Sequence, residues 1–148
     1  MSSDTEYLPS PSARSRNQVE EYESSGGTRA NTLEGTGMPV VIVTMRGARS
    51  GKIRKVPLMR VEHDGAYLAV ASMGGAPQHP QWYHNLVADP WTRVQDGPEP
   101  VETRARLISG AERAEWWERA VAAYPPYAEY QQRTEREIPL FLLEPTGR

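Results

Sequence analysis

The chain has 148 residues and a formal net charge of −2, with 19 acidic and 17 basic side chains. This length predicts one domain that buries roughly two-thirds of its unfolded surface, and the acidic balance argues against a general affinity for nucleic acid. The absence of cysteine excludes disulfides, cysteine zinc sites and iron–sulfur clusters, and it fits a reducing cytoplasm. Residues 1–15 lack the apolar core of a secretory signal.

The N-terminal part predicts a disordered tail and then a short helix. Residues 1–14 are rich in serine and proline, which is typical of disorder, so the folded domain is expected over residues 15–148. Val19 and Tyr22 lie three residues apart and predict a helix over residues 14–22. A loop is expected from there to Gly37.

The remaining chain predicts short strands with a few helices between them. The strands are expected over residues 39–45, 53–62, 66–72, 92–95, 101–108 and 139–144, and the helices over residues 80–88, 109–123 and 127–133. Pro57 places its strand at a sheet edge or a bulge. The pattern indicates a mainly β fold with flanking helices, of the α+β class, built as a small β-barrel.

A basic turn joins the first two expected strands. It contributes Arg46, Arg49, Ser50, Gly51, Lys52, Arg54 and Lys55, and no acid occurs between Glu34 and Glu62. Arginine supplies planar forked donors and glycine lets backbone amides face a ligand, so this turn suits phosphate or carboxylate groups. The alternative is a solvated, charged hairpin. Nucleic acid is a weak candidate because the segment lacks interleaved stacking aromatics.

Three further stretches are candidates for a site. Ser72-Met-Gly-Gly75 follows an apolar strand and suits close approach to a flat ligand, with a plain turn as the alternative. Tyr124, Tyr127 and Tyr130 recur every third residue, which forms either a row of phenol donors or an amphipathic cover for the barrel. The two histidines at 79 and 84 are five apart and have no carboxylate partner, so no metal is expected.

Taken together, these segments resemble the deazaflavin-dependent nitroreductases, the F420H2-dependent quinone reductase-like proteins of actinobacteria. The resemblance runs from about Val19 to Pro145. It is carried by Gly37-Met-Pro-Val-Val-Ile-Val-Thr44, Arg46-Gly-Ala-Arg-Ser-Gly-Lys-Ile-Arg-Lys-Val-Pro-Leu58, Ala71-Ser-Met-Gly-Gly75, His79-Pro-Gln-Trp-Tyr-His-Asn-Leu86 and Tyr124-Pro-Pro-Tyr-Ala-Glu-Tyr130. It implies a split β-barrel of the flavin-reductase, FMN-binding type that holds coenzyme F420.

The resemblance also implies a set of site residues. Cofactor contacts are expected at Arg46, Arg49, Ser50, Gly51, Lys52, Arg54, Lys55, Val56, Pro57, Ala71, Ser72, Met73, Gly74, Gly75, Trp82 and Asn85. The basic members would hold the phosphate and the glutamate tail, and the others would surround the ring. Ser72, Tyr124, Tyr127 and Tyr130 are the expected catalytic residues. One departure is Met73, at a position that is basic in some relatives.

The function implied is hydride transfer from reduced F420 to a quinone or a nitroaromatic acceptor. Two alternatives stay open, a split-barrel reductase that uses FMN and a non-catalytic protein that carries F420. The expected partners are a small-molecule acceptor and no nucleic acid, and the protein is expected to be a monomer or a homodimer. A cytoplasmic location is expected. A peripheral contact of the N-terminus with the inner face of the cell membrane stays open, although this segment is polar here.

Overall fold

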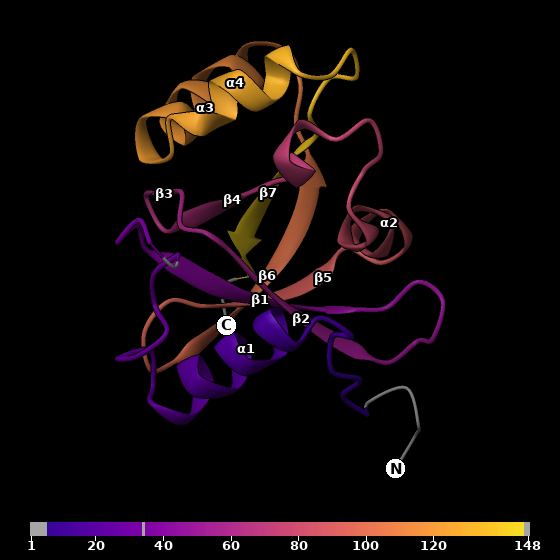
Figure 1. Cartoon of the computed structure of the whole chain (residues 1–148). Helices are drawn as coiled ribbons and strands as arrows, with labels where there is room; N and C mark the ends of the chain where they lie inside the picture. Colours follow the sequence, from indigo (N-terminus) through magenta and orange to yellow (C-terminus); the bar gives the residue numbers. More distant parts are fainter. Residues whose placement is uncertain (1–5, 34, 147–148) are drawn as a thin grey trace.

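The computed structural model describes residues 6–33 and 35–146 and has one curled antiparallel sheet at its centre (Figure 1). The strands are β1 (Val40–Arg46), β2 (Ile53–Met59), β3 (Glu62–His63), β4 (Ala66–Val70), β5 (Trp91–Gln95), β6 (Pro100–Leu107) and β7 (Leu140–Pro145). Their order in the sheet is β2-β1-β5-β6-β7-β4-β3, so β2 and β3 are the two edges. The edge position predicted from Pro57 is confirmed, because β2 pairs only with β1 among the named strands.

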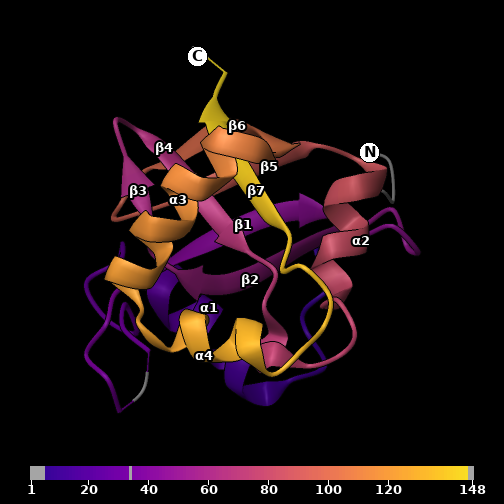
Figure 2. The ribbon, with the colours of Figure 1, turned by 90° about the horizontal axis from the view of Figure 1, so that it is seen from above.

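Four α-helices flank the sheet. They are α1 (Ala13–Ser24), α2 (Gln81–Ala88), α3 (Gly110–Ala123) and α4 (Pro126–Gln132), and a 3₁₀ turn, η2 (Met73–Gly75), follows β4. In Figure 1, α1 lies below β1 and β2 while α3 and α4 lie on the opposite side of the molecule. Figure 2 shows the same arrangement from above, with α2 beside the sheet. The predicted mainly β architecture with flanking helices is therefore confirmed.

β1 is buried on both faces, which explains its continuous apolar run. Val41, Val43 and Met45 belong to a core cluster that also contains Leu86 of α2. Val40 and Ile42 face the other way, where they pack with Val19 and Tyr22 of α1. A strand covered on both sides carries apolar residues at consecutive positions rather than at alternate ones. A third cluster lies between α3, α4 and the strands β4 and β7.

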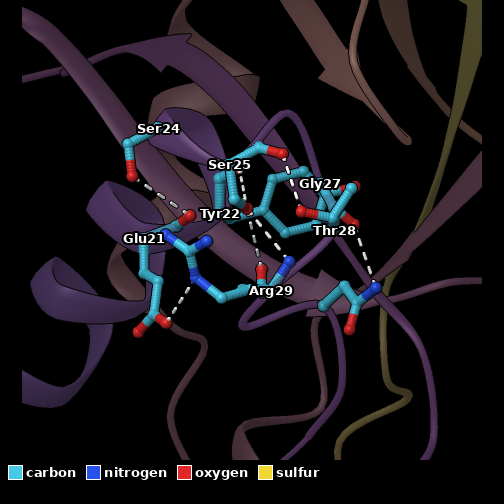
Figure 3. A network of polar contacts seen from close by, with 8 residues as sticks. Glu21, Tyr22, Ser24, Ser25, Gly27, Thr28 and Arg29 are labelled. Carbon is cyan, nitrogen blue, oxygen red and sulfur yellow. Dashed lines mark hydrogen bonds and ion pairs between the residues drawn. The ribbon is translucent and has the colours of Figure 1, made fainter.

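The C-terminal end of α1 is tied down by a polar network (Figure 3). Ser25 donates its hydroxyl to the carbonyl of Tyr22 and accepts the Arg29 amide at 3.0 Å, while the Arg29 guanidinium pairs with Glu21 at 3.2 Å. The Tyr22 hydroxyl donates to the carbonyl of Gln95 at 3.2 Å and accepts the Gly97 amide at 2.9 Å. These bonds fix α1 against the β5–β6 hairpin.

Residues 6–8, which the sequence placed in the N-terminal tail, run along the edge strand β2. Residues 1–5 lie outside the described residues, but Glu6 and Leu8 bond the backbone of Ile53 at 2.8 Å each, and Tyr7 forms a parallel bridge with Ile53. Helix α1 begins at Ala13, with the Ser12 side chain capping its first turn. An edge strand offers unpaired backbone groups, which explains why this segment orders along β2.

The strand expected over residues 53–62 is broken by a corner. β2 ends at Met59, the Arg60 amide donates to the carbonyl of Pro39 at 3.0 Å, and β3 then pairs with β4 at the other edge of the sheet. The Arg60 guanidinium fixes the corner by donating to Asp96 at 2.8 Å. The chain therefore passes from one edge of the sheet to the other here, which a single-strand prediction missed.

Candidate functional site

A cavity of about 450 Å³ opens between β2, the turn after β4, Tyr124 at the end of α3 and the two tyrosines of α4. It is lined by Arg14, Ser15, Gln18, Leu33, Val40, Pro57, Leu58, Met59, Val70, Ser72, Met73, Gly74, Pro80, Trp82, Tyr124, Tyr127 and Tyr130. Most of this wall is apolar, with hydroxyl groups at a few positions, which is typical of a small-molecule site. Eight residues of the predicted site therefore meet in one space: Pro57, Ser72, Met73, Gly74, Trp82 and the three tyrosines.

The turn that follows β4 carries Ser72 into the cavity wall. Met73, Gly74 and Gly75 have φ values of 48°, 65° and 83°, so three consecutive residues adopt left-handed backbone conformations. Ser72 is 8% exposed, and its hydroxyl makes no hydrogen bond to another residue in the described part of the chain. The hydroxyl is thus available to a ligand, and its predicted contact with one stays a prediction.

Gly75 is required for a close approach to α4, and we expect Gly75→Ala to destabilise the protein. A Cβ there would lie 2.6 Å from the Tyr130 carbonyl oxygen, at a φ of 83°. The expected loss is about 2–4 kcal/mol of unfolding free energy in urea. Gly74→Ala is the matched control because its φ is 65° but a Cβ would meet nothing within 4 Å. It should cost about 1 kcal/mol; equal losses would mean that the contact with α4 is unimportant.

The three tyrosines form one aromatic wall. The hydroxyls of Tyr124 and Tyr130 are 3.1 Å apart and share a hydrogen bond in which either can donate. Tyr127 packs edge-on against both, with ring centroids 5.0 and 6.1 Å away. The chain turns a corner between Tyr124 and Tyr127. Pro125 and Pro126 end α3 and start α4 there.

Tyr124 and Tyr127 keep their protons at neutral pH because the pKa of each is raised. The hydrogen bond with Tyr130, followed by burial, raises the pKa of Tyr124 to about 12, and burial raises the pKa of Tyr127. One of the two hydroxyls donates its proton to the hydrogen bond between Tyr124 and Tyr130. The proton of the other hydroxyl remains free to bond an acceptor in the cavity. The wall can therefore donate a hydrogen bond, or a proton, to a bound oxygen atom.

The basic turn is held from within before any ligand binds. The Arg46 guanidinium donates to the Gly51 carbonyl at 2.9 Å, and the Ser50 hydroxyl accepts the Lys52 amide at 3.1 Å. From α2, the Asn85 side chain accepts the Ala48 amide at 2.9 Å and donates to the Met45 sulfur at 3.5 Å. Asn85 thus positions this turn and does not line the cavity, so its predicted contact with the cofactor ring stays a prediction.

Three of the basic side chains already have acidic partners, the first of them Arg46, whose guanidinium lies 3.6 Å from Asp89. Lys52 pairs with Glu6 at 2.6 Å, and Lys55 pairs with Glu23 at 2.7 Å and lies over the Tyr7 ring. Arg49 and Arg54 have no carboxylate partner among residues 6–33 and 35–146. These two arginines are therefore the cations best placed to take an external anion.

β2 connects the basic turn to the cavity. Arg54 and Lys55 lie near the start of this strand. Its last three residues, Pro57, Leu58 and Met59, line the cavity. Three residues of an extended strand span about 10 Å, so a ligand bound in the cavity can reach the basic residues with a tail of modest length. The mostly apolar cavity and the cationic end of β2 thus form one elongated candidate site.

Sequence reasoning missed one side of this site. Arg14, Ser15 and Gln18 come from the first turns of α1, and Leu33 comes from the loop after it. The spacing of Arg14 and Gln18, four residues apart, places them on one helix face, but no sequence pattern says which strand that face covers. Of the predicted residues, Val56, Ala71 and Gly75 do not line the cavity, so their predicted cofactor contacts stay predictions.

The fold is a curled antiparallel sheet of the half-barrel kind, and its edge strand β2 joins a basic turn to a mostly apolar cavity. The F420H(2)-dependent quinone reductase family matches residues 14–145, and the chain belongs to this family. An F420H(2)-dependent quinone reductase of Mycobacterium tuberculosis is 31% identical over 125 residues, which cover 82% of this chain and 83% of that protein. The resemblance read from the sequence motifs is confirmed.

Solved structures agree with this assignment. An F420-H2 dependent reductase is 55% identical, with a TM-score of 0.69, over 72% of this chain and 94% of that one. A protein described as a domain-swapped dimer is 49% identical, with a TM-score of 0.71, over 87% of this chain and 96% of that one. The predicted split β-barrel is confirmed.

Proposed function

We propose that this protein catalyses the reduction of a quinone by reduced coenzyme F420. The observation that supports this most directly is the continuity of β2, which carries free arginine charge at one end and cavity wall at the other. A cofactor with a flat ring and a polyanionic tail fits such a site, because the tail needs cations and the ring needs an apolar slot. When bound, reduced F420 supplies the hydride.

The protein's own groups bind and orient the two reactants. We assign Arg49, Arg54, Lys52 and Lys55 to the tail, since they gather around the start of β2. Pro57, Trp82 and Gly74 then form walls that exclude water from the cavity. With FMN, a single phosphate would leave much of this charge unused, so the arrangement favours F420.

The acceptor oxygen meets donors in this cavity. As a quinone is reduced, negative charge develops on its oxygen atoms, and donors aimed at that charge stabilise the transition state. The Ser72 hydroxyl and the Tyr124–Tyr130 pair are the hydroxyl groups assigned to this role. With a pKa of about 12, Tyr124 keeps its proton at neutral pH.

Glu23→Gln is expected to tighten F420 binding. Glu23 neutralises Lys55 in the free protein, at 2.7 Å, and an anionic tail competes with that ion pair. Removing the carboxylate should improve the affinity about threefold at low salt and less at high salt, because surface pairs are weak and screened. Fluorescence titration measures it. Glu115→Gln on α3, paired with Arg119 at 3.9 Å, is the control and should change nothing. Unchanged affinity in Glu23→Gln would place the tail away from Lys55.

Several finer points of the function also remain proposals. Nitroaromatic compounds are flat acceptors of similar size, and we propose them as alternative substrates of the same cavity. A homodimer is the proposed assembly, since one relative is described as a domain-swapped dimer. No helix among the described residues is both long and apolar enough to cross a membrane. Peripheral membrane contact through the N-terminus and a cytoplasmic location are predictions that localisation of a tagged protein would test.

The direct test of the function is quinone-dependent oxidation of reduced F420. Purified protein should accelerate this oxidation with a water-soluble quinone, and the rate should saturate with both substrates. Replacing reduced F420 by reduced FMN should give little activity. Tight F420 binding without turnover for any quinone or nitroaromatic acceptor would contradict the proposal and indicate a carrier protein.

A further inference from the structure

Arg136, on the connection between α4 and β7, makes hydrogen bonds to the turn that forms one wall of the cavity. The Arg136 guanidinium donates to the carbonyl oxygens of Ala76, Ala71 and Ser72 at 2.9, 3.1 and 2.8 Å. Its Nη1 also lies 3.1 Å from Nδ1 of His79. A single side chain therefore holds four points of a nine-residue segment, from the end of β4 to the start of α2.

The partners of Arg136 are all neutral groups. No carboxylate pairs with it among the described residues, and burial lowers the pKa of its guanidinium. Charged arginines on a protein surface more often face carboxylates or water. Here the planar guanidinium, whose N–H donors point in fixed directions, bonds three backbone carbonyls at once. The ammonium group of a lysine cannot reproduce this geometry.

The segment that Arg136 holds has an unusual backbone. Three consecutive residues, Met73, Gly74 and Gly75, have positive φ, and the first of them is not a glycine. Such conformations persist only where the surroundings enforce them. Since the Ser72 carbonyl is bound by Arg136 as well as by the Gly75 amide at 2.9 Å, the orientation of Ser72 depends on this arginine.

The segment that Arg136 binds also contacts two other walls of the cavity, formed by α2 and by the tyrosines. The His79 ring stacks on Tyr83 of α2, with centroids 4.0 Å apart, and Tyr83 is next to the cavity residue Trp82. On the other side, Gly75 lies so close to α4 that a Cβ would be 2.6 Å from the carbonyl oxygen of Tyr130. Movement of the turn would therefore shift both the α2 wall and the tyrosine wall.

We propose that Arg136 is a positioning residue for the reaction, which sets the turn with Ser72 against the tyrosine wall so that both face one acceptor. Its effect on catalysis rests on the function proposed above. The hydrogen bonds of Arg136 with the turn exist in the free protein, so their effect on the turn can be measured without cofactor. Because the cations of the basic turn come from other elements, affinity for the tail should not depend on Arg136.

The first arm of the test is amide hydrogen exchange in the free protein. In Arg136→Lys, which keeps the charge, the amides of Gly75 and Ala76 should exchange at least about tenfold faster, while amides of β1 stay unchanged. Arg113→Lys is the matched control, since Arg113 also binds this connection, at the Ile138 carbonyl at 2.8 Å, but does not touch the turn. Unchanged exchange at Gly75 and Ala76, or equal acceleration in β1, would overturn the proposal.

The second arm separates catalysis from binding. In Arg136→Lys, kcat with F420 and a quinone should fall about tenfold or more, while Kd for F420 stays within about threefold. Equal effects in Arg113→Lys would reduce Arg136 to a general stabilising role and contradict the proposal. If the wild type does not bind F420, the proposed function fails, yet the exchange arm still decides whether Arg136 holds the turn.

A milder variant covers the case in which Arg136→Lys does not fold. His79→Ala removes one of the four acceptors and leaves the three carbonyls. It should raise exchange at Gly75 and Ala76 about threefold, with a matching smaller fall in kcat. No change in either quantity would show that the turn holds its shape without this contact and would count against the proposal.

Discussion

Arg54→Glu is expected to lower the affinity for F420 by roughly 10- to 100-fold at low salt. Arg54 lies at the start of β2 and has no carboxylate partner among the described residues, so its charge is available to an anionic tail. Losing one charge-assisted hydrogen bond costs about 1.5–3 kcal/mol, and the new carboxylate adds repulsion. Fluorescence titration at two salt concentrations measures it, and the deficit should shrink at high salt.

A matched change of charge elsewhere is the control for this result. Arg104→Glu alters the net charge equally on β6, which β1 and β5 separate from β2 in the sheet. It should leave F420 affinity within about twofold, because screening weakens charges beyond about 10 Å. Equal losses in both variants would mean that the net charge governs binding. Unchanged affinity in Arg54→Glu would place the tail on another surface.

The double substitution Tyr124→Phe with Tyr130→Phe is expected to slow quinone reduction by roughly 100-fold or more. Either single variant keeps one hydroxyl in the cavity wall and should lose about tenfold or less, because the two groups act as one hydrogen-bonded donor. Affinity for F420 should change little, since the proposed tail contacts lie in the basic turn and at the start of β2. Steady-state kinetics of all three variants gives the comparison.

Tyr83→Phe is the control for the tyrosine wall. Tyr83 is on α2 and stacks on His79, but it does not line the cavity, so loss of its hydroxyl should leave the rate within about twofold. Turnover by the double variant at more than a third of the wild-type rate would remove both tyrosines from the mechanism. The protonating group would then be Tyr127, Ser72 or water.

The sequence allowed much of the fold to be predicted because several local signals agree with it. The apolar run of β1 and the proline before α2 placed these elements within a residue or two. The tyrosine spacing also predicted the wall that the α3–α4 corner builds. These features depend on residues that are close together in the sequence, so local patterns are enough to predict them.

What could not be predicted depends on contacts between distant segments. The corner at Arg60 is set by Pro39 and Asp96, and the tail at Glu6 is ordered by β2. Arg136 lies about sixty residues from the turn that it binds, and nothing in its local sequence marks that role. The contacts of the Asn85 side chain with Ala48 and Met45 likewise join segments about forty residues apart.

Whether the cavity and the basic turn bind F420 is decided by a titration of the free protein with F420 and, separately, with FMN at two salt concentrations. We expect weak FMN binding and tight F420 binding that weakens as salt rises, because Arg49 and Arg54 are the proposed contacts of the anionic tail. Tight FMN binding with weak F420 binding would contradict this expectation and assign the cavity to an ordinary flavin. Binding of neither would remove the functional claim altogether.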